Sequence, residues 1–192
     1  MTVTFYFDWV CPWCWIGWRH LQAARAQAPG TRLAWRGFAL LPDVPAAGLP
    51  YQEFYVRRLG STAAVAARRA QVAAAGAAAG LVFAFERIDT MPNTQLAHAM
   101  FAHAQLVGSD RQCEALCEAI FQAWFVEGRD IGQRACLLDL ARGVGLDFSG
   151  ASGHAALPVT GIYSVPTLAV EGRGQLQGLQ SPQQVLDLLG IR

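Results

Sequence analysis

Apolar and polar residues alternate at the start of the chain. Val3, Phe5 and Phe7 are separated by more polar residues, which predicts a short strand with one buried face. Residues 15–28 are rich in alanine, leucine, arginine and glutamine, and the proline and glycine at 29–30 follow them. We therefore predict that the first strand leads into a helix that ends near residue 28.

The next apolar residues, Leu33, Trp35 and Phe38, predict a second strand over 31–40. A strand, a helix and a second strand at this spacing form a right-handed parallel unit. The pattern then becomes helical almost throughout 51–145. We predict helices at 51–59, 62–79, 94–106, 110–126 and 130–142, with an extended segment at 80–89 and with Asn93, Asp110 and Asp130 as N-caps.

The last part of the chain returns to strands. Residues 143–161 contain many glycines and are predicted to form a loop or at most a short helix. Two short strands, 167–170 and 175–178, flank a hairpin signal, and Ser181-Pro182 opens a final helix that ends near Gly190. The first and last parts must fold together, because neither alone closes a sheet.

The strand-to-helix junction carries the motif Cys11-Pro12-Trp13-Cys14. Pro12 fits the first helical turn, where no amide donor is lost. The free amides and the positive end of the helix dipole favour an anion there, so Cys11 is expected to ionise more easily than a free thiol. Cys14 lies one turn further on, where it can attack a mixed disulfide formed at Cys11. This placement indicates redox chemistry.

A structural zinc site or two buried cysteines are the alternatives. Zinc needs two further ligands at matching spacing. The other cysteines and the histidines do not form a second C-x-x-C-like pair, so we expect no metal; they are Cys113, Cys117, Cys136, His20, His98, His103 and His154.

The strand followed by CPWC resembles the thioredoxin-fold proteins of the DsbA family. The most similar branch is the FrnE-like one, which is related to 2-hydroxychromene-2-carboxylate isomerase and kappa-class glutathione transferase. Three further stretches carry the resemblance in the family's order: MPNTQLAH at 91–98, FQAWFVEGRDI at 121–131 and SVPT at 164–167. The resemblance implies an α/β, thioredoxin-like fold with a large all-helical insertion. The implied thioredoxin-like domain is discontinuous, 1–42 and 155–192, and the insertion is 43–154.

The resemblance also implies functional residues. In the family, the proline that matches Pro166 is cis and lies beside the reactive cysteine, and the residue that matches Val165 offers its backbone to a peptide or glutathione. Asn93 and His98 match a stretch that faces the active site. A helix cap is the plain alternative for Asn93, and a satisfied interhelical histidine is the alternative for His98. Trp13 is the tryptophan expected to remain accessible and to contact substrate.

Other polar and thiol groups have simpler interpretations. Asp8 could tune Cys11 or transfer a proton, but we favour a role in ending the strand or in hydrogen-bonding the turn. Cys113 and Cys117 could form a second redox pair, but an intrahelical disulfide is strained, so we expect two half-buried thiols. Cys136 is expected in the core.

Composition narrows the class of protein. Of 192 residues, 53% are hydrophobic and 15% are charged, which is enough for a substantial core, and the net charge is +1. No basic run suggests nucleic acid, and no stretch suggests a membrane span. The chain shows no secretory signal pattern, so we expect a cytoplasmic protein whose cysteines are catalytic or buried.

These patterns predict a thiol–disulfide oxidoreductase with Cys11 as nucleophile and Cys14 as resolving thiol. It would act on a protein or small-molecule disulfide, with no bound cofactor and with glutathione as a candidate co-substrate. A glutathione-dependent isomerase or transferase is one alternative, although such relatives usually have serine at the reactive position. A non-catalytic peptide-binding module is another. Homodimer formation stays open.

Overall fold

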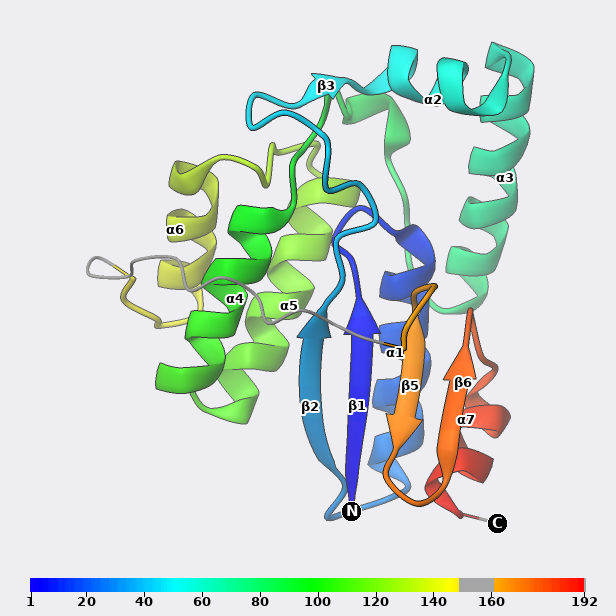
Figure 1. The fold of residues 1–192 in the computed structure, drawn as a ribbon, viewed down its shortest axis with the longest axis vertical. Helices are drawn as coiled ribbons and strands as arrows, with labels where there is room; N and C mark the ends of the chain where they lie inside the picture. The colour runs from blue at the N-terminus through cyan, green and yellow to red at the C-terminus, as the bar shows by residue number, and fades with distance from the viewer. Residues whose placement is uncertain (149–160, 192) are drawn as a thin grey trace.

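The computed structural model describes residues 1–148 and 161–191. Its central sheet has the strand order β2-β1-β5-β6 (Figure 1). The strands are β1 (Thr2–Phe7), β2 (Arg32–Gly37), β5 (Thr167–Val170) and β6 (Gly174–Gln177). β1 pairs in parallel with β2 and antiparallel with β5, which pairs antiparallel with β6. The sheet therefore joins the first part of the chain to the last.

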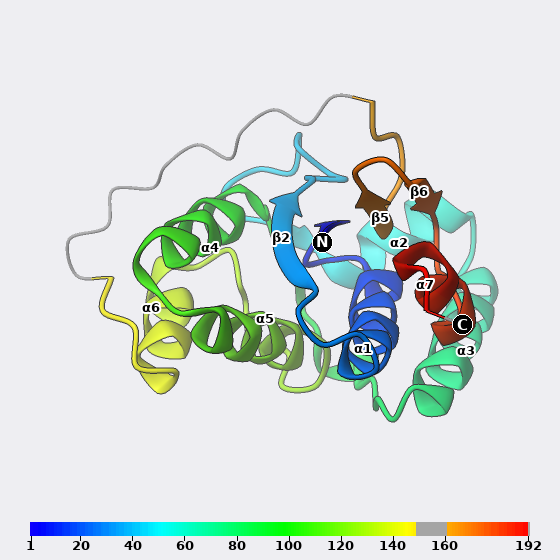
Figure 2. The same cartoon turned by 90° about the horizontal axis from the view of Figure 1, so that it is seen from below.

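Two helices cover one face of this sheet, α1 (Pro12–Ala26) and α7 (Pro182–Leu189) (Figures 1 and 2). α1 presents Trp15, Ile16 and Trp18 to the core. Ser181 caps α7 through the amide of Gln184, whose side chain returns to the Ser181 amide in a capping box. The strand–helix–strand unit, the hairpin and the last helix are confirmed.

The helices between β2 and β5 form the rest of the molecule. They are α2 (Tyr51–Leu59), α3 (Thr62–Ala78), α4 (Gln95–Val107), α5 (Asp110–Phe125) and α6 (Arg134–Gly143). α4, α5 and α6 stand beside the β2 edge of the sheet, while α2 and α3 lie near the N-terminal end of α1 (Figures 1 and 2). A two-residue ladder joins β3 (Leu49–Pro50) to β4 (Thr90–Met91).

Aromatic side chains join the sheet to this helical block. The ring centroid of Trp9 lies 5.1 Å from those of both Phe101 in α4 and Phe121 in α5. Trp35 in β2 lies 5.3 Å from Phe101. Such aromatic pairs each stabilise the fold by about 0.5–1.5 kcal/mol beyond the burial of their surface. We call these four residues the aromatic seam.

Several predicted boundaries are wrong in detail. α1 begins at Pro12 rather than at residue 15. Ser109, not Asp110, caps α5, because a serine followed by Gln112 completes a capping box. Asp130 does not cap α6, because its carboxylate is bound to the Gly132 amide in a turn ahead of the helix.

Two further expectations need comment. The segment 80–89 is not extended throughout, because it contains a 3-10 turn, η1 (Phe85–Arg87). The predicted loop over 143–161 falls largely on residues 149–160, outside those described. The division into 1–42 plus 155–192 and 43–154 remains a proposal, and its second boundary also lies outside the described residues.

Within residues 1–148 and 161–191, no helix combines the length and the apolar character needed to cross a membrane.

Candidate active site

The two cysteines of the CPWC motif lie where β1 passes into α1. Cys11 is the N-cap of the helix, with extended backbone angles, and Pro12 occupies the first helical position. The turn is fixed by hydrogen bonds from the Cys11 amide to the Asp8 carbonyl and from the Cys14 amide to the Cys11 carbonyl. No acidic residue lies in the first turn of α1, so no side-chain carboxylate competes there for the helix N-terminus.

Cys11 faces the segment that precedes β5. Its thiol lies 3.8 Å from the carbonyl oxygen of Val165, to which it donates. The Val165–Pro166 peptide bond is cis. Pro166 also packs closely on α1, because a Cβ atom at Gly17 would lie only 3.1 Å from its Cγ. Cys11 and Val165 are more than 150 residues apart in the sequence, and the fold brings Cys11, Val165 and Pro166 together at the site.

Cys14 is fully buried, and both thiols of the motif are free. The amide of Asp8 lies 3.5 Å from the Cys14 sulfur, to which it donates. Burial is the main reason why the pKa of Cys14 is raised well above its ordinary value, and a hydrogen bond with Cys11 and the charge of Cys11 add to the rise. Burial therefore favours the neutral thiol form of Cys14.

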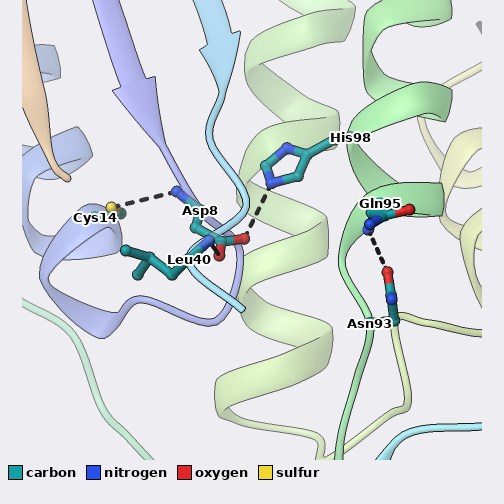
Figure 3. A network of polar contacts seen from close by, with 6 residues as sticks. All are labelled: Asp8, Cys14, Leu40, Asn93, Gln95 and His98. Atoms are coloured by element: carbon teal, nitrogen blue, oxygen red, sulfur yellow. Dashed lines mark hydrogen bonds and ion pairs between the residues drawn. The ribbon is translucent and has the colours of Figure 1, made fainter. Parts of the chain in front are cut away.

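A buried polar network lies behind Cys14 (Figure 3). Oδ1 of Asp8 lies 3.0 Å from Nε2 of His98, and Oδ2 accepts a hydrogen bond from the amide of Leu40 at 2.7 Å. Asp8 is fully buried and His98 nearly so. Asp8 thus does more than end β1: it links β1, the segment after β2 and α4 beside Cys14. His98 has a hydrogen-bond partner, as the alternative interpretation required. That partner is the carboxylate of Asp8 at the end of β1, and not a group on a neighbouring helix.

Gly37 makes room for His98. A Cβ atom at Gly37 would collide with the imidazole ring, so the last residue of β2 must be glycine for the ring to reach Asp8. Neither Gly37 nor the Leu40 amide was singled out in the sequence. A glycine inside the predicted strand 31–40 was the available signal, because such a glycine often marks the close approach of another group.

Trp13 and Asn93 have different surroundings. Trp13 is only partly buried, whereas Trp9, Trp15 and Trp18 are in the core, as expected. The side chain of Asn93 accepts from the Gln95 amide at 2.9 Å (Figure 3). It also donates to the Val44 carbonyl. These bonds hold the start of α4 and show the capping role that was the alternative interpretation, although the formal N-cap is Thr94.

The remaining cysteines lie apart from the motif. Cys113 and Cys117 are buried rather than half-buried, because both face the core from α5. Burial raises the pKa of Cys113 to about 11 and that of Cys117 well above its ordinary value. Cys136 is only partly buried, so its expected place in the core is wrong. Among the described residues, no three histidine, cysteine or acidic side chains group closely enough to hold a metal ion.

Solved structures share this fold. A probable DsbA oxidoreductase from Streptomyces coelicolor is similar over 100% of this chain and 91% of its own, with a TM-score of 0.80 and 24% identity. The cytosolic disulfide reductase DsbM from Pseudomonas aeruginosa, solved with GSH, is similar over 99% and 98%, with a TM-score of 0.64 and 20% identity. A 2-hydroxychromene-2-carboxylate isomerase is similar over 99% and 93%, with a TM-score of 0.65 and 16% identity.

A search of the curated proteins found no match. The family model of the DSBA-like thioredoxin domain matches residues 2–158, which is most of the chain. This match includes β1, the CPWC motif and all helices from α1 to α6. The α/β, thioredoxin-like fold implied by the sequence is thereby confirmed, and the chain belongs to the DSBA-like thioredoxin domain family.

Proposed function

We propose that this protein is a thiol–disulfide oxidoreductase in which Cys11 is the nucleophile and Cys14 the resolving thiol. The observation that carries the proposal is the difference between the two sulfurs. Cys11 caps a helix N-terminus and retains 6% of its exposure, whereas Cys14 retains none and is held by the Asp8 amide. A helix N-terminus favours a thiolate, and burial disfavours one.

In the first step, the Cys11 thiolate attacks one sulfur of a substrate disulfide, and the other sulfur leaves as a thiolate. A mixed disulfide then joins Cys11 to the substrate. Val165, Pro166 and Trp13 border this position, and we propose that they bind the substrate, with Asn93 supporting the facing segment through Val44.

The second step follows from the causes of the raised pKa of Cys14. Once Cys11 is in a mixed disulfide, its negative charge is gone, so one cause that raises the pKa of Cys14 disappears. Cys14 therefore ionises more easily when it has to attack. Its thiolate displaces the substrate sulfur from Cys11, and the two electrons of the dithiol leave with the reduced substrate.

Trapping tests these roles. Cys14→Ser leaves Cys11 able to attack but removes the resolving thiol, so adducts reversible by dithiothreitol should accumulate on Cys11 in cell extract. Cys11→Ser should trap far less, because Cys14 is buried. Mass spectrometry of both variants reads the result. Equal trapping by the two variants would show that the roles of Cys11 and Cys14 are assigned wrongly. Trapping by neither variant would contradict disulfide exchange.

We also propose glutathione as a reductant of the Cys11–Cys14 disulfide and a cytosolic place of action. The similar DsbM structure, described as a cytosolic disulfide reductase with GSH, supports both. An insulin-reduction assay with and without glutathione tests the first. Turnover that is independent of glutathione would contradict it.

A further inference from the structure

The hairpin of α2 and α3 carries an unbalanced positive charge. Four arginines lie on these two helices, and Glu53 is their one acidic residue. Among the described residues, none of these arginines is in an ion pair. They are Arg57, Arg58, Arg68 and Arg69. A positive cluster without acidic partners attracts anions.

Beside this cluster is a small pocket with a cavity volume of about 30 Å³. One wall is Pro12 of the CPWC motif, so the pocket adjoins the reactive cysteine. Its lining combines aromatic rings and two cations with aliphatic side chains; the residues that matter here are Pro12, Tyr51, Tyr55, Phe85, Arg68 and Arg69. A cavity needs roughly 10–15 Å³ of such volume to hold one water molecule, so this one has room for a single small group, such as a carboxylate, and not for a whole ligand.

Arg69 is held rigidly within this pocket. Its guanidinium carbon lies 5.1 Å from the ring centroid of Tyr51 and 5.9 Å from that of Phe85. Its Nη2 donates to the side chain of Gln52 at 2.8 Å. Its buried Nε has no hydrogen-bond partner among the described residues. A fixed guanidinium with a spare donor suits a carboxylate, because the planar group can pair with both oxygens.

The pocket also lies within electrostatic reach of the nucleophile. Tyr55 lines it, and burial raises the pKa of Tyr55 to about 12, with the negative charge of Cys11 as the next cause. Tyr55 and Tyr51 are in edge-to-face contact, with ring centroids 4.9 Å apart. Pro12, the sequence neighbour of Cys11, and Tyr55 therefore both relate this pocket to the CPWC motif.

We propose that this pocket binds a carboxylate-bearing group of the disulfide that Cys11 attacks. Arg69 pairs with the carboxylate, and the rings of Tyr51, Tyr55 and Phe85 contact the carbon atoms next to it. The inference rests on the proposed oxidoreductase function and narrows its substrate class to disulfides with an acidic group near the sulfur. Such a group is present in small carboxylate disulfides and in peptides with glutamate beside cysteine.

Two aromatic disulfides serve as probes: dithiobis(nitrobenzoate), which carries carboxylates, and dithiodipyridine, which carries none. With either, the Cys11 thiolate forms a mixed disulfide and releases one aromatic thiolate. Cys14 then releases the second, so two electrons pass from the protein to the probe. The released aromatic thiol gives the rate directly.

Arg69→Gln should slow the reaction with dithiobis(nitrobenzoate) about tenfold, as for loss of a hydrogen bond to a charged group. Its reaction with dithiodipyridine should change less than about twofold. Arg57→Gln is the matched control, because it removes the same charge from an exposed arginine that does not line this pocket. If both variants slow the reaction with dithiobis(nitrobenzoate) equally, the effect is a general attraction of the anionic probe to positive charge, and the proposed binding in the pocket is wrong.

Failure of the pocket and failure of the proposed function give different results. If neither probe converts the wild-type dithiol to the Cys11–Cys14 disulfide, the oxidoreductase proposal fails. If both do so and Arg69→Gln shows no preference between them, only the pocket is wrong.

Two further measurements complete the test. Peptide disulfides with glutamate or glutamine beside the cysteine separate the two sources of the carboxylate. If Arg69→Gln slows the reaction with the glutamate peptide but not with the glutamine peptide, the substrate class includes polypeptides. If it slows neither peptide, the substrate class is limited to small disulfides. If Arg69→Gln does not fold, nitrobenzoate should still slow the wild-type reaction with dithiobis(nitrobenzoate) more than nitrobenzamide does. Equal inhibition by the two would overturn the proposal.

Discussion

Oδ1 of Asp8 lies 3.0 Å from Nε2 of His98, while the amide of the same aspartate contacts the sulfur of Cys14. One residue therefore connects Cys14 at the start of α1 to a buried histidine of α4. Both side chains are almost completely removed from solvent. Loss of either partner would therefore leave the other buried without its hydrogen bond, which costs free energy of folding. This connection gives the first of four predictions.

Asp8→Asn should lower the pKa of Cys14, because the aspartate charge is one of the causes that raise it. The rate at which Cys14 resolves a mixed disulfide on Cys11 should then reach its plateau at a lower pH. Stopped-flow release of dithiodipyridine products across pH measures this. A midpoint that moves upward would instead indicate that Asp8 accepts the proton of Cys14. Asp43→Asn, an exposed aspartate, is the control and should have no effect.

Gly37→Ala should destabilise the protein by about 1–3 kcal/mol, because the added methyl group overlaps the His98 ring. It should also displace His98 from Asp8 and change the histidine resonance in an NMR spectrum. Gly143→Ala is the matched control: a methyl group there would meet nothing within 4 Å in the part of the chain that the structure describes, so it should be neutral or stabilising. Similar behaviour of the two variants would show that His98 moves freely.

Cys117 should make the reduced protein sensitive to alkali. Its pKa is raised in the folded state, chiefly by burial, so its contribution to stability is complete below the ordinary thiol value of about 8.5. Above that pH the unfolded chain ionises while the folded one does not, and stability falls until the folded pKa is passed. Denaturant unfolding of Cys117→Ala should show a shallower alkaline decline than wild type. Cys136→Ala, at a partly buried thiol, should change the slope less.

Trp13→His should make the Cys11–Cys14 disulfide more oxidising, because a histidine between the cysteines adds a partner for the reduced thiolate. For the wild type we expect a reduction potential between roughly −270 and −120 mV, the values of thioredoxin and DsbA. Equilibration with glutathione buffers measures both proteins. An unchanged or more negative potential in the variant would refute this reasoning.

Short-range patterns predicted most of the fold. The alternation of Val3, Phe5 and Phe7, the helix signals after Cys14 and the cap at Ser181 all depend on neighbours in the sequence, and the structure confirms those elements. The caps at Asp110 and Asp130 were wrong because several nearby residues could cap, and only the final chain path selects one.

The site was less accessible to sequence reasoning. The position of Cys11 at a helix start follows from local pattern, and the neighbourhood of Pro166 was implied by resemblance. The approach of His98 to Asp8 depends on a missing side chain at Gly37 and on the packing of α4 against β1. No periodicity records that packing. The same is true of the pocket that Pro12 shares with Arg69.

The aromatic seam has a consequence for how the molecule unfolds. Trp9, in the turn that leads to Cys11, has its indole packed on Phe101 and Phe121 of the helical block, and Trp35 packs on Phe101 as well. Separating the block from the sheet would expose all four of these rings to water at once. We therefore expect a single cooperative transition, in which β1, the strand that leads to Cys11, and the helices between β2 and β5 lose their structure together.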